Sequence, residues 1–365
     1  MAYRISAQQL DRKPAQRAVT DATIFDFGIQ DTGRDGASWA LANRGVPLES
    51  PAALVESGDV ALAWTLRGAP HYYRRDDLVD VMVATSPLSE ADAGKRIFDA
   101  ARPLREAHIE VLDGLTDVAT VMRSVVERPM SKGDMSGALT ERLDPVHLRW
   151  CVPCQATHPW EQPFRLAALY AGLELQPGTS PPVLQRIPGW PRRQAGPAAD
   201  PLSAPQRLQP IRNYLRLLGP AAPQDVAGFL DAPLAVVKEH WPDDAVEVEV
   251  DGAKRWLLGE PEPPEVDAKL VRLLGGFDLF LQGRDRSLIV PDKSRHKTLW
   301  PTIGRPGAVL SGTEVIGTWR PKAAGRKFTL RLDLWESASK AVRARIETEA
   351  EKLAAHRGLQ LVGIE

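Results

Sequence analysis

Proline is concentrated in one stretch near the middle of this chain. Eight prolines lie between Pro177 and Pro205, and a second proline-rich segment, PEPPE, occupies residues 261–265. Proline lacks a backbone N–H and fixes its own φ, so this density excludes a long helix and indicates a linker or an extended strap. A chain of 365 residues is also too long for one compact core. We therefore expect several domains.

Composition places the chain among ordinary globular proteins. Hydrophobic residues make up 43% and charged residues 25%, as is usual for that class. No apolar run reaches the roughly 18–20 residues that span a bilayer, and the first residues lack the apolar core of a secretory signal. We expect a cytoplasmic monomer with no membrane partner. Two cysteines provide no disulfide framework, and a net charge of −1 excludes a polycation but not a basic face.

The first segment, residues 1–86, has the outline of a winged helix. Helical periodicity extends over residues 14–27, and a second helix is expected over residues 35–45 with Asp35 as its N-cap. GDVALAWTLRG alternates like a strand, APHYY forms a turn, and RRDDLVDVMVA starts a new helix. Helix, turn, helix and strand in this order are typical of a winged helix.

Two further winged-helix segments are expected. In residues 87–190, the stretches LTDVATVMRSVVERP and SKGDMSGALTERL predict helices, and FRLAALYAGLELQP ends in a predicted strand. Residues 191–204 belong to the proline-rich linker. In residues 205–262, three predicted helices precede AVEVEVDGAKRWLL, which indicates a hairpin around an Asp-Gly turn.

The C-terminal segment, residues 268–365, shows a different pattern. FDLFLQGRDRSLIVPD, AVLSGTEVIGTW and KFTLRLDLW predict strands, and residues 337–358 predict a closing amphipathic helix that stops at Gly358. The expected fold class is therefore α+β: tandem winged-helix domains followed by a mixed α/β domain that is mostly antiparallel sheet.

The segment FGIQDTGRDG, residues 27–36, places Gln30, Asp31 and Thr32 at a break between two predicted helices. One interpretation is a turn in which an Asp or Thr side chain caps the next helix. The other is a place that holds a water molecule for chemistry, because an amide both donates and accepts hydrogen bonds. Trp39 follows on the next helix, as a core anchor or as a group facing the same site.

The chain resembles a known family of enzymes. Its C-terminal run LLGGFDLFLQGRDRSLIVPDKSRHKTLWPTIGRPGAVLSGTEVIGTWR is similar to the C-terminal signature of the AlkZ/YcaQ-type winged-helix DNA glycosylases, and LRGAPHYYRRDDL resembles the family's Arg-Gly-x-x-His turn. The resemblance extends over nearly the whole chain. The matching residues are Arg67, Gly68, His71, Phe277, Asp278, Arg286, Gly307, Gly312, Gly317, Trp319 and Arg320.

The resemblance implies a function as well as a fold. Members of the family curve tandem winged helices around duplex DNA, excise alkylated bases and in some cases unhook interstrand crosslinks. Their catalysis depends on a Gln-x-Gln or Gln-x-Asp motif, in which Gln30 matches the first position. Thr32 replaces the second polar residue, and the carboxylate of Asp31 lies one position earlier. No cofactor is required for the reaction that the family performs.

The chemistry of that reaction suits these residue types. Cleavage of an N-glycosidic bond passes through an oxocarbenium-like sugar, and an alkylated, cationic purine leaves without help from a general acid. Gln30 would hold the water and a carboxylate would take its proton. The alternative function is a winged-helix protein that recognises DNA without cutting it, as a regulator or a damage sensor.

Arginines, a lysine and a histidine are the candidate contacts to double-stranded DNA, because wings and basic tracks lie along the phosphate backbone. For each of them, a solvated surface or a turn cap is the competing interpretation. The candidates are Arg34, Arg67, His71, Arg74, Arg75, Arg284, Arg286 and Lys297.

The segment CVPCQATH is a candidate metal site. Cys151, Cys154 and His158 have the spacing of three zinc ligands. A structural zinc site needs a fourth ligand, and His147 is the nearest further histidine. A redox Cys-x-x-Cys pair and two reduced cysteines beside a turn are the alternatives. The resembling family does not require this feature.

Overall fold

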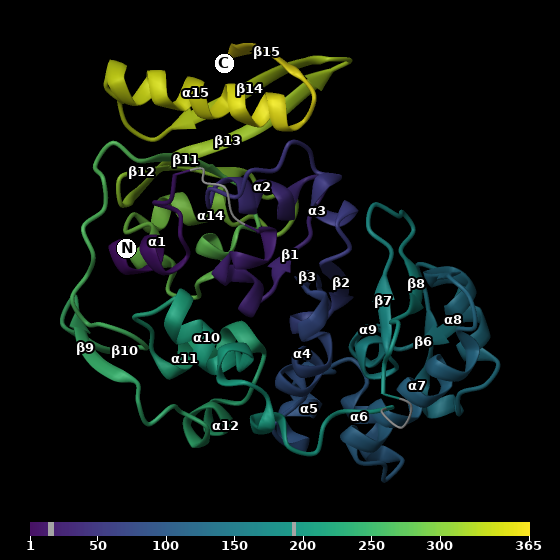
Figure 1. Ribbon diagram of the computed structural model, residues 1–365. Helices are drawn as coiled ribbons and strands as arrows, with labels where there is room; N and C mark the ends of the chain where they lie inside the picture. Colours follow the sequence, from purple (N-terminus) through teal and green to yellow (C-terminus); the bar gives the residue numbers. More distant parts are fainter. Residues whose placement is uncertain (14–17, 192–194) are drawn as a thin grey trace. The chain divides into compact units, whose positions relative to one another are not determined.

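The computed structural model describes residues 1–13, 18–191 and 195–365 (Figure 1). The chain forms two compact units, each built from separate stretches of sequence. The first unit contains Met1–Ser57, Tyr214–Asp225 and Asp244–Glu365, and the second contains Gly58–Asn213 and Val226–Asp243. The segment boundaries predicted after residues 86, 190, 204 and 262, and the tandem winged-helix arrangement, stay predictions.

A five-stranded sheet organises the first unit. Its order is β11-β12-β13-β14-β15, antiparallel except for the parallel pair β14 and β15. The strands are β11 (Val271–Leu274), β12 (Gly307–Ser311), β13 (Glu314–Ala324), β14 (Lys327–Leu334) and β15 (Gln360–Ile364). Helix α15 (Lys340–His356) packs on this sheet through an apolar cluster that includes Phe328, Ile346 and Leu353. The predicted closing helix and mostly antiparallel sheet are thereby confirmed.

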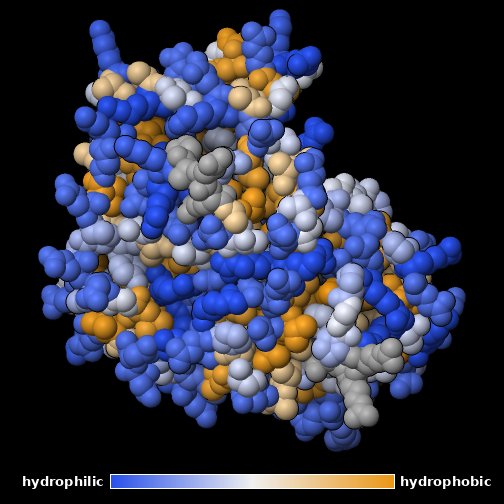
Figure 2. Space-filling view, in the orientation of Figure 1, coloured by the Kyte–Doolittle hydropathy of each residue, from blue (hydrophilic) through white to orange (hydrophobic). Residues whose placement is uncertain are grey.

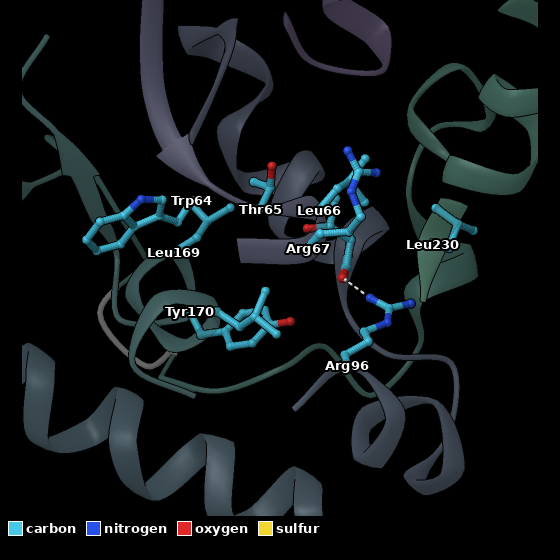
Figure 3. A pocket seen from close by; sticks show the side chains of 10 residues that line it. Trp64, Thr65, Leu66, Arg67, Arg96, Leu169, Tyr170 and Leu230 are labelled. Carbon is cyan, nitrogen blue, oxygen red and sulfur yellow. Dashed lines mark hydrogen bonds between the residues drawn. The ribbon is translucent and has the colours of Figure 1, made fainter. Parts of the chain in front are cut away.

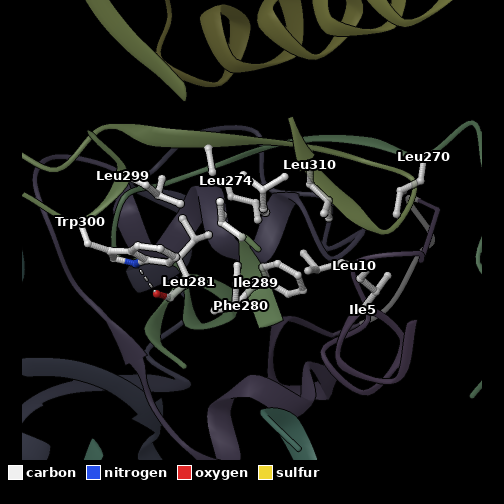
Figure 4. Close-up of a cluster of buried hydrophobic side chains, with 13 residues drawn as sticks. Ile5, Leu10, Leu270, Leu274, Phe280, Leu281, Ile289, Leu299, Trp300 and Leu310 are labelled. Atoms are coloured by element: carbon white, nitrogen blue, oxygen red, sulfur yellow. Dashed lines mark hydrogen bonds between the residues drawn. The ribbon is translucent and has the colours of Figure 1, made fainter. Parts of the chain in front are cut away.

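One predicted strand of this region is wrong. Within residues 277–292 the chain forms a 3₁₀ helix, Leu279–Gln282, and helix α13 (Arg286–Ile289) instead. The Asp278 side chain accepts a hydrogen bond from the backbone N–H of Phe280 and so starts the 3₁₀ turn. Phe280 and Leu281 are buried in a second apolar cluster (Figure 4). Periodicity alone cannot distinguish a short buried helix from a buried strand.

The N-terminal part of the first unit is made of short elements. They are α1 (Ala2–Ala7), two 3₁₀ helices (Val19–Asp21 and Thr23–Asp26), β1 (Ile29–Gln30), α2 (Gly36–Ala42) and α3 (Ala53–Glu56). The predicted helix over residues 14–27 falls partly on residues 14–17, outside the described residues. Its described remainder is the pair of 3₁₀ turns, which corrects the prediction of one longer helix. Helix α2 forms as expected after Asp35.

Three helices and a hairpin follow the proline-rich segment in the predicted order. They are α10 (Pro210–Leu217), α11 (Pro223–Leu230), α12 (Leu234–Glu239), β9 (Val246–Val250) and β10 (Ala253–Leu257). The hairpin turns at Asp251 and Gly252, which both have positive φ (50° and 74°). Positive φ at both central residues is the geometry that an Asp-Gly turn favours.

The second unit joins a sheet to a group of helices. Its strands follow the order β3-β2-β7-β8-β4, and helices α7 and α9 pack against each other. APHYY belongs to a strand that pairs with β2, so the predicted turn is wrong. The elements are β2 (Val60–Trp64), β3 (Pro70–Arg74), α4 (Leu78–Thr85), α5 (Glu90–Arg96), α6 (Ala101–Glu106), α7 (Val111–Val125), β4 (Met130–Ser131), α8 (Lys132–Thr140), α9 (Glu161–Tyr170), β7 (Leu173–Leu175) and β8 (Val183–Arg186).

The surface is that of an ordinary globular protein. On the face shown in Figure 2, hydrophobic residues appear as separate patches among hydrophilic ones, as is normal for folded proteins. Among the helices formed by the described residues, none combines the length and the hydrophobicity that crossing a bilayer requires.

Two buried ion pairs tie the short N-terminal helices to the C-terminal part of the first unit. Arg4 of α1 donates to Asp285, with Nη1 2.9 Å from Oδ1, and Arg44, just after α2, donates to both oxygens of Asp278 at 2.8 Å. All four side chains are at most 2% exposed. Removing one partner of such a pair leaves the other charge desolvated and uncompensated.

We expect Arg44→Met to lower the free energy of unfolding by about 3–5 kcal/mol, because Asp278 would stay buried without its guanidinium. Urea denaturation measures the change. Arg102→Met is the matched control, because Arg102 forms its ion pair with Glu106 at the surface; we expect no measurable loss there. Equal stability of the two variants would contradict the importance of the buried pair.

Candidate functional site

The Gln-Asp-Thr segment forms a tight loop between β1 and α2. Strand β1 ends at Gln30, Gly33 adopts a positive φ of 72°, and the backbone N–H of Gly36 donates to the carbonyl of Thr32 at 3.2 Å. A Cβ at Gly36 would lie 3.5 Å from Cβ of Thr32 and 4.0 Å from the carbonyl oxygen of Gln30. The loop therefore folds back over the start of α2.

Helix α2 is attached to the C-terminal sheet and helix by buried polar side chains. The indole N–H of Trp39 and the amide of Asn43 both donate to the carbonyl of Leu273 in β11, at 2.6 and 3.1 Å. Ser38 Oγ lies 2.9 Å from His356 Nε2 in α15. Trp39 is thus a core anchor, one of the two interpretations left open by the sequence. These attachments fix the helix that carries the loop.

Asp31 is the chemically unusual residue of the loop. Burial of its carboxyl, followed by the negative charge of Asp35, raises its pKa from 3.8 to about 6. Asp35 itself is paired with Arg357, whose Nη2 lies 3.1 Å from Oδ1. A carboxyl with a pKa near 6 is ionised at neutral pH, but it accepts a proton more readily than an ordinary aspartate does.

Thr32 does not cap helix α2. Its hydroxyl is buried and has no hydrogen-bond partner within the described part of the chain. Asp35 is the N-cap of α2, and its side chain makes no capping hydrogen bond. A buried hydroxyl without a partner is unfavourable, and a hydrogen bond to a water or a ligand would remove that cost. Gln30, two residues earlier at the end of β1, is half-buried.

Arg67 and His71 lie in the second unit, at and after the turn between β2 and β3. Arg67 has a φ of 59°, donates from Nη1 to the carbonyl of Phe229 at 3.0 Å, and stacks on the Phe229 ring at 4.2 Å. It lines a small pocket together with Trp64, Leu169, Tyr170 and Leu230, among others (Figure 3). The guanidinium is already engaged within the unit.

His71 is a buried support of that turn. Its Nδ1 lies 2.9 Å from the carbonyl of Ala69 and 3.0 Å from Oγ1 of Thr65. Burial, and then the charge of Arg67, lowers its pKa to about 3, so the ring is neutral. At 3% exposure it has almost no surface for a phosphate, and its position does not support the predicted DNA contact.

The next two arginines are held by acidic partners. Arg74 lies 3.4 Å from Asp77, and Arg75 Nη1 lies 2.9 Å from Glu174. Arg34 is exposed in the loop before α2, and Lys297 is exposed on α14 (His296–Leu299). Of these four candidates, the exposed Arg34 and Lys297 are better placed to contact a backbone phosphate than the paired Arg74 and Arg75.

A concentrated positive charge surrounds α13 in the first unit. Arg286 stacks on Trp300 at 5.0 Å, and Arg305 stacks on Phe277 at 4.7 Å. Burial, and then the charge of Arg284, lowers the pKa of Arg286; burial and the charges of Arg286 and Arg284 lower that of Arg305. We call Arg284, Arg286 and Arg305 the arginine cluster. Arg305 was not among the predicted DNA contacts, although it lies in the same C-terminal signature as Arg284 and Arg286.

The structure also brings together the three candidate metal ligands. The side-chain ligand atoms of Cys151, Cys154 and His158 all lie within 4.8 Å of one another. They belong to a hairpin of the second unit, and His147 is not part of the group.

With the geometry in place, comparison with known proteins identifies the family. Residues 27–356 match the family described as DNA glycosylase AlkZ-like. This chain belongs to the AlkZ-like family. Among solved structures, Streptomyces sahachiroi DNA glycosylase AlkZ is similar to it, with a TM-score of 0.70, 19% sequence identity, and coverage of 100% of this chain and 97% of that chain. No curated protein sequence matches.

The AlkZ-like match covers both the Gln30 loop and the arginine cluster, since both lie within residues 27–356. The structural similarity extends over the full chain and supports the overall fold. Sequence reasoning missed Arg357 and His356, because each meets its partner, Asp35 or Ser38, across more than 300 residues of intervening chain.

We expect Asp31→Asn to stabilise the protein at neutral pH. The folded pKa, about 6, exceeds the ordinary value of 3.8 for an aspartate, so ionising Asp31 costs folding free energy. That cost is absent below pH 3.8 and complete above about pH 6, where it amounts to about 1–3 kcal/mol. The midpoint of thermal unfolding should rise in the variant at pH 7.5, and the gain should shrink as the pH falls towards 5.

Asp113→Asn is the matched control, since Asp113 is an exposed carboxylate on α7. It should show no gain that grows between pH 5 and pH 7.5. If Asp31→Asn destabilises the protein at pH 7.5, the carboxylate makes a favourable contact and its ionisation is not unfavourable.

Proposed function

We propose that this protein is a monofunctional DNA glycosylase that hydrolyses the N-glycosidic bond of alkylated, cationic purines in double-stranded DNA, including bases joined in crosslinks. Membership of the AlkZ-like family supports the glycosylase class. The observation that carries the proposal is the half-buried Asp31 carboxyl with a pKa near 6, next to the unpartnered hydroxyl of Thr32, in the loop that begins with Gln30.

The proposed reaction balances with water as the only co-reactant. The bond between C1′ and the purine nitrogen breaks, and its electron pair returns to the base and neutralises the positive charge there. Water forms the new bond to C1′ and passes its proton to the carboxylate of Asp31. The ionised carboxylate also stabilises the positive sugar of the transition state.

Each of the three loop residues has a separate task in this proposal. The amide of Gln30 orients the water, because it can accept one of the water's hydrogens and donate to a neighbouring acceptor. Asp31 is the base, with a pKa close to the working pH. Thr32 Oγ1 gives the water a second hydrogen bond in place of the second polar residue of the family motif, but it is a poor base itself.

The arginine cluster is the proposed contact to the DNA backbone. Arginine forks match phosphate geometry. Within the described residues, no ion pair with a carboxylate is found for Arg284, Arg286 or Arg305. The positive charges of the three guanidinium groups therefore repel one another, and an approaching phosphate would relieve that repulsion. Exposed Ile303 (88%) precedes Gly304, whose φ is 66°, beside Arg305. This loop combines an apolar tip with an arginine, as surfaces that meet DNA bases and backbone do.

A non-catalytic DNA-binding protein is the second candidate. Thr32 in place of the second Gln or Asp of the family motif favours it, because a hydroxyl cannot replace a carboxylate as a base. Asp31 distinguishes the two functions. Its pKa suits a catalytic base, so a variant without this carboxylate should still bind DNA but no longer cleave the N-glycosidic bond.

We expect wild-type protein to form abasic sites in DNA that contains N7-methylguanine, and Gln30→Ala to lower the single-turnover rate at least tenfold. Losing one positioning interaction in a transition state costs roughly 1–3 kcal/mol. Gln360→Ala, an exposed glutamine of β15, is the matched control and should keep the wild-type rate. Undiminished product with Gln30→Ala would remove that amide from the mechanism, and no product from the wild type on any alkylated DNA would favour the binding protein.

The rate should also depend on pH through Asp31. Because the base must be ionised, activity should fall as the pH drops below about 6. Asp31→Asn should abolish this dependence along with most of the rate. A wild-type profile that stays flat from pH 5 to pH 8 would exclude Asp31 as the base.

We expect Arg284→Gln to weaken binding to undamaged duplex DNA and to reduce the slope of log affinity against log salt by about 0.9, the contribution of one phosphate contact. Fluorescence anisotropy over a salt series measures both. Arg142→Gln is the control, because Arg142 is an exposed arginine of the second unit, 3.8 Å from Glu141. An unchanged slope in Arg284→Gln would exclude this residue from the interface.

A further inference from the structure

The two cysteines of the chain lie on one short hairpin of the second unit. Strands β5 (Leu148–Cys151) and β6 (Ala156–Pro159) pair with Cys151 opposite Ala156 and Arg149 opposite His158. Four residues form the tip, where Gln155 has a φ of 51° and its side chain donates to the carbonyl of Val152 at 2.7 Å. A two-stranded hairpin of this length is marginally stable by itself.

The hairpin brings three metal-binding atoms into one small volume. The two sulfurs and a ring nitrogen of His158 lie within 4.8 Å of one another. Zn²⁺ bound tetrahedrally at about 2.3 Å from sulfur and about 2.0 Å from nitrogen would hold such atoms about 3.5–3.8 Å apart. Movements of about 1 Å, with the exposed Cys154 free to move most, bring the three atoms to that spacing without a change in the strand register.

The ring of His158 is already oriented for a metal. Its Nδ1 lies 2.8 Å from the carbonyl of Pro159. A carbonyl can only accept, so Nδ1 carries the hydrogen and Nε2 keeps its lone pair. A ring N–H bound to a backbone carbonyl is the usual arrangement of metal-ligating histidines.

We propose that Cys151, Cys154 and His158 bind one Zn²⁺ ion, with solvent as the fourth ligand. The donor set of two thiolates and one imidazole selects a soft or borderline metal over Mg²⁺ or Ca²⁺. Among the described residues, no fourth His, Cys, Asp or Glu joins the group, and Cys154 is exposed, so the fourth position is open to water.

The ion would fix the tip of the hairpin. Trp150 and Val152 flank Cys151 and are 59% and 68% exposed, so few contacts of their own hold them. A metal that joins the end of β5, the tip and β6 closes the turn and fixes both side chains. Binding to the folded hairpin therefore stabilises the second unit.

The test uses the full-length protein, reduced and freed of metal. Titration with Co²⁺ should give tetrahedral visible bands and a thiolate charge-transfer band that saturate at one equivalent, and Zn²⁺ should displace them. Because the chain contains only two cysteines, any thiolate signal comes from this hairpin. Zn²⁺ should raise the midpoint of thermal unfolding of the wild type.

Three variants and one control complete the experiment. Cys151→Ser and Cys154→Ser should each lose saturation at one equivalent, and His158→Asn should weaken Zn²⁺ binding at least tenfold. His108→Gln, an exposed histidine at the end of α6, should bind like the wild type. A reduced wild type that gives no charge-transfer band, equal binding by Cys154→Ser or His158→Asn, or a Cys151–Cys154 disulfide that persists under mild reduction would overturn the proposal.

Discussion

The candidate site depends on how helix α2 is fixed to the C-terminal sheet. Trp39 and Asn43 share the carbonyl of Leu273, Ser38 meets His356, and Arg44 pairs with Asp278. Buried polar groups of this kind cost free energy unless every partner is present. The helix therefore has one well-defined position, and the loop before it can hold a carboxyl whose ionisation is unfavourable.

The same attachments explain why the unfavourable ionisation of Asp31 is tolerated. Asp31 is destabilised by burial and by Asp35, while the pairing of Asp35 with Arg357 and the buried contacts of α2 offset that cost within one unit. Proteins place such local penalties at functional positions, where the surrounding structure over-determines the conformation. The cost at Asp31 and its proposed reactivity have the same cause, which is a carboxyl kept from water.

Sequence reasoning predicted the regular elements best where local chemistry decides them. The Asp251-Gly252 hairpin, the serine-capped α8 and α15, and the strand Val60–Trp64 form as expected, because turn geometry, caps and alternation are local. The strand predicted over residues 277–292 failed because the Asp278 side chain starts a 3₁₀ turn at Phe280, and periodicity does not distinguish a short buried helix from a buried strand. The Gln30 loop and Asp35 were found from sequence, whereas the partner Arg357 and the stacked Arg305 required the folded chain.

The placement of both cysteines on one turn has a consequence for the reactivity of the chain. Thiolates are the strongest nucleophiles among protein side chains, and the reagents that methylate DNA also attack sulfur. Because both cysteines of the chain lie on this hairpin, any reaction of a cysteine thiolate with such a reagent occurs at Cys151 or Cys154. A bound metal ion would engage both sulfurs, so its occupancy would determine how readily the two thiolates react.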